Sequence, residues 1–385
     1  MNKYTERFIA KSVKKLYGNK KNEKAKGILV ISCQAIGDTI TRTPFFRELR
    51  RNFPDSYITA VCTRRTYNLI ELCPYFDEII RYEPHEKKRR VISTRYLEEL
   101  YSSYKLGKSL RDKYQLCFIP TITTHKIYEA WIPYFAKIPR IIGYSEKYFT
   151  YTHNRFDGTY DMYLTDVLYS DSTKHEVLVN LDMLKYIGCV VKNDELEYWL
   201  DDSDREFATN ILSDNKDNIN VVINLTAMVR EREWPIEKWI DLCKELNVIR
   251  KNITFILVGA GALSRKYRDI FAGEIKNVLD LTDKTTLRQT MAVMEKSDFY
   301  LGSETGTTQM AAAVGIPGLA TFLPENVLEP MAKGTIRFKP WKSNVKVLSP
   351  KKPLQGCEIQ CNANKSHCIA QIRVEDMLAN FQKIL

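Results

Sequence analysis

The 385-residue sequence has no long apolar run. No stretch approaches the about 18 consecutive apolar residues of a membrane-spanning helix, and the first residues lack the apolar core of a signal peptide. We therefore expect no transmembrane helix and a cytoplasmic location. Hydrophobic residues make up 44% and charged residues 27%, which is ordinary for globular proteins, and the length suits two domains.

Three kinds of motif are also missing. A nicotinamide-dependent Rossmann oxidoreductase needs a GxGxxG turn followed by an acid about 20 residues later. The sequence has no complete turn of this kind, and Gly259–Gly261 is only part of one. This function is therefore disfavoured but stays an alternative. No recognised nucleic-acid motif occurs, so we expect no nucleic-acid partner despite the net charge of +11. The cysteines form no disulfide framework, because their count of nine is odd and Cys33, Cys117 and Cys243 sit in apolar runs, which favours a reducing compartment.

Most of the positive charge lies in the first 26 residues. They hold nine Lys or Arg against two acids, a net charge of +7, and their apolar side chains recur with helical spacing over residues 4–17. A basic amphipathic helix of this kind can lie on an anionic membrane surface, on the inner face of the cytoplasmic membrane. A helix packed on its own domain, or a partly ordered tail, is the alternative, and both interpretations stay open.

The remaining chain alternates between buried-strand and helix patterns, and the alternation restarts near the middle. Strands are predicted at 27–32, 57–62, 78–82, 116–120, 220–225, 254–259, 299–302 and 319–322, and helices at 39–52, 86–111, 234–246, 305–314 and 374–384. The fold class is therefore α/β, with two Rossmann-like, doubly wound domains at residues 27–190 and 191–385 after the 1–26 segment. We expect the basic stretch 86–111 to be an exposed helix and the final helix, 374–384, to pack on the first domain.

Asp38 is the first candidate for chemistry. It ends the loop 33–38 between a buried strand and a helix, where Gly37 permits a tight turn and leaves room for a ligand. Ligands bind beyond the carboxyl ends of strands in such sheets, so this carboxylate can accept a proton from an acceptor hydroxyl. The alternative is an N-cap for the helix that begins at Thr39.

Two segments of the second half can bind a diphosphate. Residues 304–309 (ETGTTQ) open a helix, where backbone N–H groups, the helix dipole and three threonine hydroxyls can meet a phosphate. Residues 230–235 (REREWP) carry two arginines that can neutralise a pyrophosphate. A plain capped helix and a solvated run of charges are the respective alternatives.

Two patterns look like metal sites. The DSD run at 202–204 has the DxD form, but it opens a predicted helix, where capping is the expected role. Cys357, Cys361 and Cys368, with His367 adjacent, have a spacing that matches no standard zinc site. We expect no metal at either place, and the sequence leaves the question open for the three cysteines.

Together these motifs resemble glycosyltransferase family 9, the heptosyltransferase family, from about Gly27 to the final helix. ILVISCQAIGDTITRTPFFRELRRNFPDSYITAV is similar to the family's opening strand, Gly-Asp loop, proline-containing helix and second strand. REREWPIEKW is similar to its basic residue two before Trp-Pro, and DFYLGSETGTTQMAAAVGIP to its Asp-Thr-Gly-x-x-His-x-x-Ala-Ala block. The cysteine-bearing tail of this chain, ending CIAQIRVEDML, is also similar to the family.

The resemblance implies a GT-B fold, in which two Rossmann-like domains face a cleft, and an inverting, metal-independent transfer without a cofactor. The donor would be a nucleotide sugar, usually ADP-heptose, and the acceptor a hydroxyl of a cell-surface glycan or lipopolysaccharide precursor. A catalytically inactive, nucleotide-binding protein on the same GT-B scaffold is the other alternative.

By position, the resemblance makes Asp38 the general base, Arg232 the contact to the donor phosphates, and Thr305–Thr308 the phosphate-binding turn. Glu304 stands where the family usually has Asp and Gln309 where it usually has His, so the identity of the sugar stays open. The expected substrate-binding residues are Gly37, Arg230, Arg232, Gly259, Glu304, Thr305, Gly306, Thr307, Thr308 and Gln309.

Overall fold

A computed structural model describes residues 27–84, 92–121, 126–146, 159–170, 173–324, 334–358 and 366–384. The basic segment 1–26, with its predicted amphipathic helix, lies outside these residues. The chain divides into two compact units: the first comprises residues 1–35, 44–67 and 73–194, and the second comprises 36–43, 68–72 and 195–385. Short stretches from before residue 73 therefore belong to the second unit.

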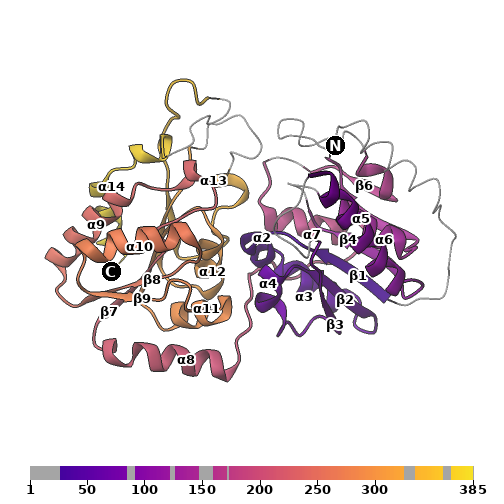
Figure 1. Ribbon diagram of the computed structural model, residues 1–385, viewed down its shortest axis with the longest axis horizontal. Helices are drawn as coiled ribbons and strands as arrows, with labels where there is room; N and C mark the ends of the chain where they lie inside the picture. The colour runs from indigo at the N-terminus through magenta and orange to yellow at the C-terminus, as the bar shows by residue number, and fades with distance from the viewer. Residues whose placement is uncertain are drawn as a thin grey trace. The chain divides into compact units, whose positions relative to one another are not determined.

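The first unit is built on a parallel sheet with the strand order β3-β2-β1-β4-β5-β6 (Figure 1). Its strands are β1 (Gly27–Ser32), β2 (Tyr57–Cys62), β3 (Glu78–Arg81), β4 (Tyr114–Ile119), β5 (Arg140–Tyr144) and β6 (Asp166–Leu168). Its helices are α3 (Thr43–Asn52), the first part of α4 (Arg64–Ile70), α5 (Ile92–Ser109), α6 (Ile127–Phe135) and α7 (Glu176–Tyr186). The last residues of α4, from 68, belong to the second unit. Every residue of β1 is buried, as expected for a strand covered on both faces.

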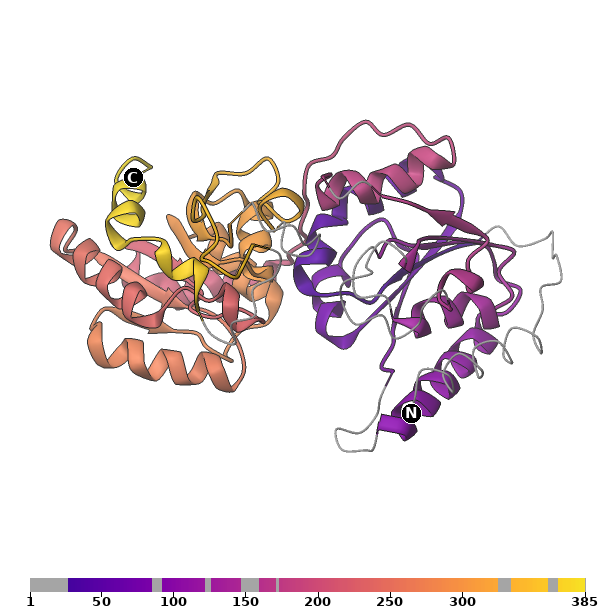
Figure 2. The same ribbon diagram turned by 90° about the horizontal axis from the view of Figure 1, so that it is seen from above.

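Helix α5, seen as one long helix in Figure 2, is packed along one side rather than exposed throughout. Gly107 lets it approach α6, because a Cβ atom at this position would lie 2.5 Å from the Cβ atom of Phe135. Tyr96 and Leu110 are buried in the core of the unit. The expectation of an exposed helix was wrong for α5, because apolar side chains along one side of it pack against the core. Residues 86–91 of the predicted helix lie outside the described residues.

The second unit repeats the same topology, with the order β12-β11-β10-β7-β8-β9. Its strands are β7 (Ile219–Ile223), β8 (Ile253–Leu257), β9 (Val278–Asp280), β10 (Phe299–Ser303), β11 (Gly318–Thr321) and β12 (Val345–Leu348). Its helices are α2 (Ile36–Thr41), α8 (Asp202–Leu212), α9 (Ile236–Ile249), α10 (Ala262–Glu274), α11 (Leu287–Glu295), α12 (Gly306–Val314), α13 (Gly334–Arg337) and α14 (Val374–Phe381). None of the helices in the described residues is long and apolar enough to cross a membrane.

Both sheets follow the Rossmann order, which confirms the predicted fold class of two doubly wound domains. In such sheets the strand order reverses at one point, and ligands bind beyond the carboxyl ends of the two strands there. In the second unit these strands are β7 and β10. The segments that follow them contain Arg232 and Glu304, respectively.

The helix predicted at 39–52 is two helices, α2 and α3, separated at Arg42. Pro44 has no N–H to donate to the carbonyl of Ile40, and the Thr43 hydroxyl donates to that carbonyl instead, at 2.9 Å. Because α2 begins at Ile36, Asp38 lies in its first turn, and the alternative of an N-cap before Thr39 was wrong.

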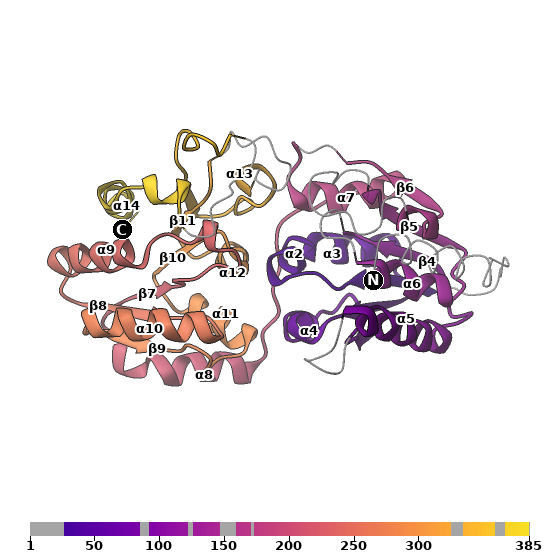
Figure 3. The ribbon, with the colours of Figure 1, turned by 45° about the horizontal axis from the view of Figure 1, so that its top comes forward.

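The final helix, α14, packs within the second unit and not on the first, so that expectation was also wrong. It lies alongside α9, as Figure 3 shows. Met377 and Phe381 lie in the apolar core of the second unit, where the ring centroids of Phe381 and Phe299 are 4.6 Å apart. The apolar face of α14 therefore completes the core of its own unit.

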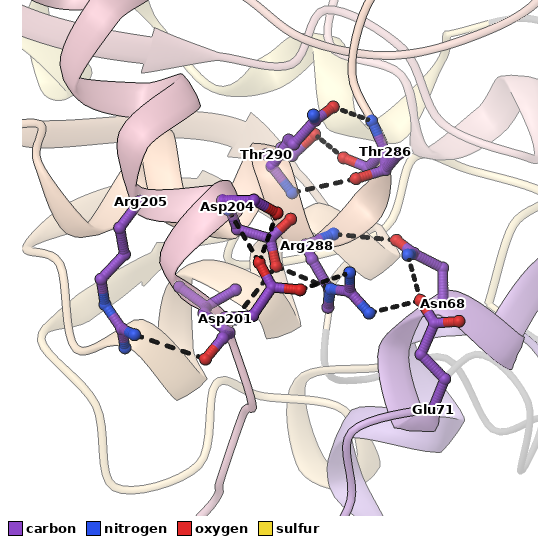
Figure 4. A network of polar contacts seen from close by, with 11 residues as sticks. Asn68, Glu71, Asp201, Asp204, Arg205, Thr286, Arg288 and Thr290 are labelled. Atoms are coloured by element: carbon purple, nitrogen blue, oxygen red, sulfur yellow. Dashed lines mark hydrogen bonds and ion pairs between the residues drawn. The ribbon is translucent and has the colours of Figure 1, made fainter.

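The DSD run at 202–204 starts α8, and its buried acid, Asp204, has a structural role (Figure 4). The N-cap is the preceding Asp201, whose side chain accepts from the N–H of Asp204 in a capping box. The Asp204 carboxylate accepts from Arg288 Nε at 2.7 Å, and Arg288 also pairs with Asp201 and Glu71. The expected structural role is confirmed, although the cap lies one residue earlier.

Candidate functional site

Helix α2 brings Asp38 to the start of α12, and both helices belong to the second unit. The approach needs glycine at position 306 and leaves little room for a side chain at position 37. A Cβ atom on Gly306 would lie 2.8 Å from the Cβ atom of Ile36, and one on Gly37 would lie 3.3 Å from Cγ of Gln309. The half-buried Asp38 is thus next to the turn that the sequence indicated for phosphate binding.

The first turn of α12 offers backbone N–H groups. Thr305 is the N-cap, and its side chain makes no capping hydrogen bond within the described residues. The hydroxyls are used to fix the turn: Thr308 Oγ1 donates to the carbonyl of Ser303 at 2.5 Å, and Thr305 and Thr307 are hydrogen-bonded to each other at 2.6 Å. Because Thr308 is fully buried, its hydroxyl is not available to a ligand, whereas Thr305 and Thr307 are half-buried. The backbone amides and the dipole of the helix start are groups that could bind an anion there.

Two residues that the sequence did not single out hold this turn in place. The side chain of Asn224, which directly follows β7, donates to Thr307 Oγ1 at 2.6 Å. The hydroxyl of Tyr300, inside β10, lies 3.0 Å from Thr308 Oγ1. The sequence could have indicated Asn224, because it is a polar residue at the end of a strand, whereas Tyr300 has the pattern of an ordinary core residue.

Arg232 and Glu304 form an ion pair, with Nη1 2.9 Å from Oε1. The Glu304 side chain is 5% exposed and that of Arg232 is 24% exposed. Burial raises the pKa of Glu304, and the charge of Arg232 acts in the opposite direction. No donor in the described residues is aligned for a hydrogen bond with Glu304 Oε1, so the contact is electrostatic. Arg232 is thus held beside the start of α12 and stays accessible.

The other expected binding residues have different surroundings. Arg230 is largely exposed, with Nη1 3.8 Å from Oε2 of Glu233. Gln309 is buried and donates to the carbonyl of Phe338 at 2.6 Å. Gly259 has a φ of +138°, which favours glycine, and lies beside a small hollow at the ends of β7 and β8. The hollow is lined by Leu225, Thr226, Leu257, Val258, Ser264, Arg268 and Thr282.

A separate group of possible metal ligands lies near the C-terminal end of the second unit. The ligand atoms of Cys357, His367 and Cys368 all lie within 4.8 Å of one another. Cys361, the remaining member of the sequence pattern, lies outside the described residues. The spacing in the sequence did not predict this convergence.

The sequence matches the model of glycosyltransferase family 9 (heptosyltransferase) over residues 103–367, which is more than half of the chain. Asp38 precedes the matched span, so its assignment depends on its position in the structure. No curated protein sequence matches this chain.

Solved structures with the same fold include members of this family. One is a family 9 glycosyltransferase from Veillonella parvula DSM 2008, with a TM-score of 0.72, 18% identity, and coverage of 93% of this chain and 97% of that one. Another is E. coli ADP-heptose lps heptosyltransferase II, with a TM-score of 0.70, 17% identity, and coverage of 93% and 98%. E. coli heptosyltransferase WaaC with ADP has a TM-score of 0.62, 13% identity, and coverage of 92% and 97%. The matched span and the paired Rossmann sheets show that the chain belongs to glycosyltransferase family 9 and has the GT-B fold.

Proposed function

We propose that this protein is an inverting glycosyltransferase that moves a heptose or a related sugar from an ADP-linked donor to a hydroxyl of a cell-surface glycan or lipopolysaccharide precursor. The observation that carries the proposal is the convergence of three groups within one unit. Asp38 lies next to the start of α12, and Arg232 pairs with the residue that precedes the same helix. A base and two anion-binding groups are thereby brought together. The ADP in the solved WaaC structure supports the choice of nucleotide.

In the proposed reaction the acceptor oxygen attacks the anomeric carbon while Asp38 takes its proton. The bond from the anomeric carbon to the diphosphate oxygen breaks, and its electron pair leaves with the nucleoside diphosphate. Attack from the opposite side inverts the anomeric configuration. Arg232 and the amides at the start of α12 stabilise the charge that develops on the leaving group.

Fixed cations and helix dipoles can supply this stabilisation, so the proposal needs no divalent ion and no cofactor. The protein would act at the cytoplasmic face of the membrane, where residues 1–26 attract anionic lipid through their net charge of +7.

The decisive variant is Asp38→Asn. It should retain donor affinity, measured by calorimetry against ADP-, GDP- and UDP-sugars, while turnover falls by ~10²- to 10⁴-fold. Asp202→Asn is the matched control, because Asp202 is an exposed acid at the start of α8, and its turnover should stay near that of the wild type. Near-wild-type turnover of Asp38→Asn would remove this residue from the mechanism, and failure to bind any nucleotide sugar would reject the proposed function.

A further inference from the structure

The side chains of Cys357, His367 and Cys368 converge in a way that the proposed reaction does not use. Sγ of Cys357 lies 3.3 Å from Nδ1 of His367, and Sγ of Cys368 lies 3.7 Å from the same nitrogen. Nδ1 of a neutral imidazole can accept one good hydrogen bond, so a single S–H···N contact does not account for two sulfurs.

The distances between these ligand atoms are close to those expected between ligands in a tetrahedral zinc site. Zn–S bonds of about 2.3 Å and Zn–N bonds of about 2.0–2.1 Å require S···N separations of about 3.6 Å and S···S separations of about 3.8 Å. The two observed S···N distances lie on either side of that value, and all ligand atoms are within 4.8 Å. A small adjustment of the side chains would complete three ligand bonds.

The surroundings also favour a metal. Cys357 and Cys368 are buried in the apolar core of the second unit, 4% and 1% exposed, whereas His367 is half-buried. Two thiolates and a neutral imidazole cancel the charge of Zn²⁺, so the complex carries no net charge into that core. Thiolate and imidazole ligands together select zinc over magnesium or calcium.

We propose that Cys357, His367 and Cys368 form a structural site for Zn²⁺. The two thiols release their protons on binding, and the fourth coordination position is left to water or another ligand. The site is independent of the proposed function, since none of its ligands belongs to the segments assigned to the donor.

The ion would stabilise the chain that supports Arg232. The Ser366 hydroxyl donates to the carbonyl of Glu233 at 2.6 Å, and the indole N–H of Trp234 donates to the carbonyl of Ile372 at 3.1 Å. Lys238 donates to the carbonyls of Ala370 and Ile372. These contacts join residues 366–372, which include two of the proposed ligands, to residues 233–238, which follow Arg232. Only the link from the metal site to Arg232 rests on the proposed function.

The test uses the full-length protein, stripped with a chelator and titrated with Co²⁺ and then with Zn²⁺. The wild type should bind about one ion per chain. The cobalt form should show thiolate-to-metal charge-transfer absorption, and Zn²⁺ should displace Co²⁺ and raise the midpoint of thermal unfolding. His367→Gln, at a half-buried position, and Cys357→Ser should weaken Zn²⁺ binding by at least ~10- to 100-fold.

Cys189→Ser is the matched control, because it removes a half-buried free thiol of the first unit. It should bind Zn²⁺ like the wild type. Absence of the charge-transfer band, wild-type affinity in His367→Gln, or an equal loss in Cys189→Ser would overturn the site. Zinc binding by a protein that binds no nucleotide sugar would sustain the site and reject only the proposed function.

Discussion

The ion pair between Arg232 and Glu304 makes a specific prediction about stability. Arg232→Ala would leave the Glu304 carboxylate, only 5% exposed, without its cation. Breaking a buried pair in this way costs about 3–5 kcal/mol, but Arg232 is 24% exposed and water screens the pair, so we expect a loss of about 2–4 kcal/mol. The double variant Arg232→Ala/Glu304→Gln removes both charges and should recover most of that loss.

The pH dependence of the single variant follows from the same pair. Burial raises the pKa of Glu304, and the loss of Arg232 should raise it further. A carboxyl with a raised pKa contributes stability that is fully present below its unfolded pKa of about 4.3 and is lost as the pH rises through the folded value. The deficit of Arg232→Ala should therefore shrink as the pH is lowered from about 7 toward about 5.

Donor binding separates the roles of the two residues. Both the single and the double variant lack the cation, so each should lose ~10- to 100-fold in affinity for the intact donor and the free nucleoside diphosphate. The free nucleoside has no phosphate to lose and should bind as before. Denaturant unfolding gives the stabilities and calorimetry the three affinities. If nucleoside affinity falls as much as diphosphate affinity, or if Arg232→Ala is as stable as the wild type at pH 7, the reasoning is refuted.

Three further predictions concern other parts of the chain. Deleting residues 1–24 should abolish binding to anionic vesicles and leave turnover on a soluble acceptor unchanged. The lost binding free energy should be ~1 kcal/mol per basic residue at low salt. Equal sedimentation of the full-length and the truncated protein with the vesicles would refute the membrane role. Turnover of the Zn²⁺-loaded protein should need no added Mg²⁺ or Mn²⁺, and activity that appears only when either ion is added would contradict a metal-independent transfer. Arg288→Ala should lower the free energy of unfolding by about 2–4 kcal/mol, because it leaves the buried carboxylate of Asp204 without its cation. Arg205→Ala, which breaks an exposed ion pair with Glu295, should lower it by less than about 1 kcal/mol. Equal losses in the two variants would show that burial does not set the difference.

The sequence predicted most of the strands that are apolar along their whole length, but it missed β5 and the fully buried helix α6. Strands β1 and β2 were placed at their observed bounds, because continuous burial leaves a continuous apolar run. The three-residue strands β6 and β9 were missed, since they are only half-buried and too short to show a pattern. The break between α2 and α3 follows from Pro44, whose position in the sequence indicated only a first turn.

The candidate site was predictable where chemistry follows a strand. Arg232 and the Thr305–Thr308 turn follow two predicted strands of one sheet, and topology alone directs such segments to the same edge of that sheet. Asp38 also follows a predicted strand, but that strand belongs to the other sheet. Their detailed surroundings were not predictable. The burial of the Thr308 hydroxyl and the pairing of Arg232 with Glu304 depend on side-chain packing, which spacing in the sequence does not specify.

The composition of the second unit from three separate stretches of chain has a practical consequence for protein engineering. A fragment beginning at residue 195 would lack α2, which packs on the start of α12, and Glu71, which pairs with Arg288. In the fragment, the surface of α12 around Gly306 that α2 covers would be exposed, and Arg288 would lose its ion pair with Glu71. Chimeras that exchange donor specificity between relatives should therefore transplant residues 36–43 and 68–72 together with residues 195–385, since a cut at the linker alone separates residues that fold as one body.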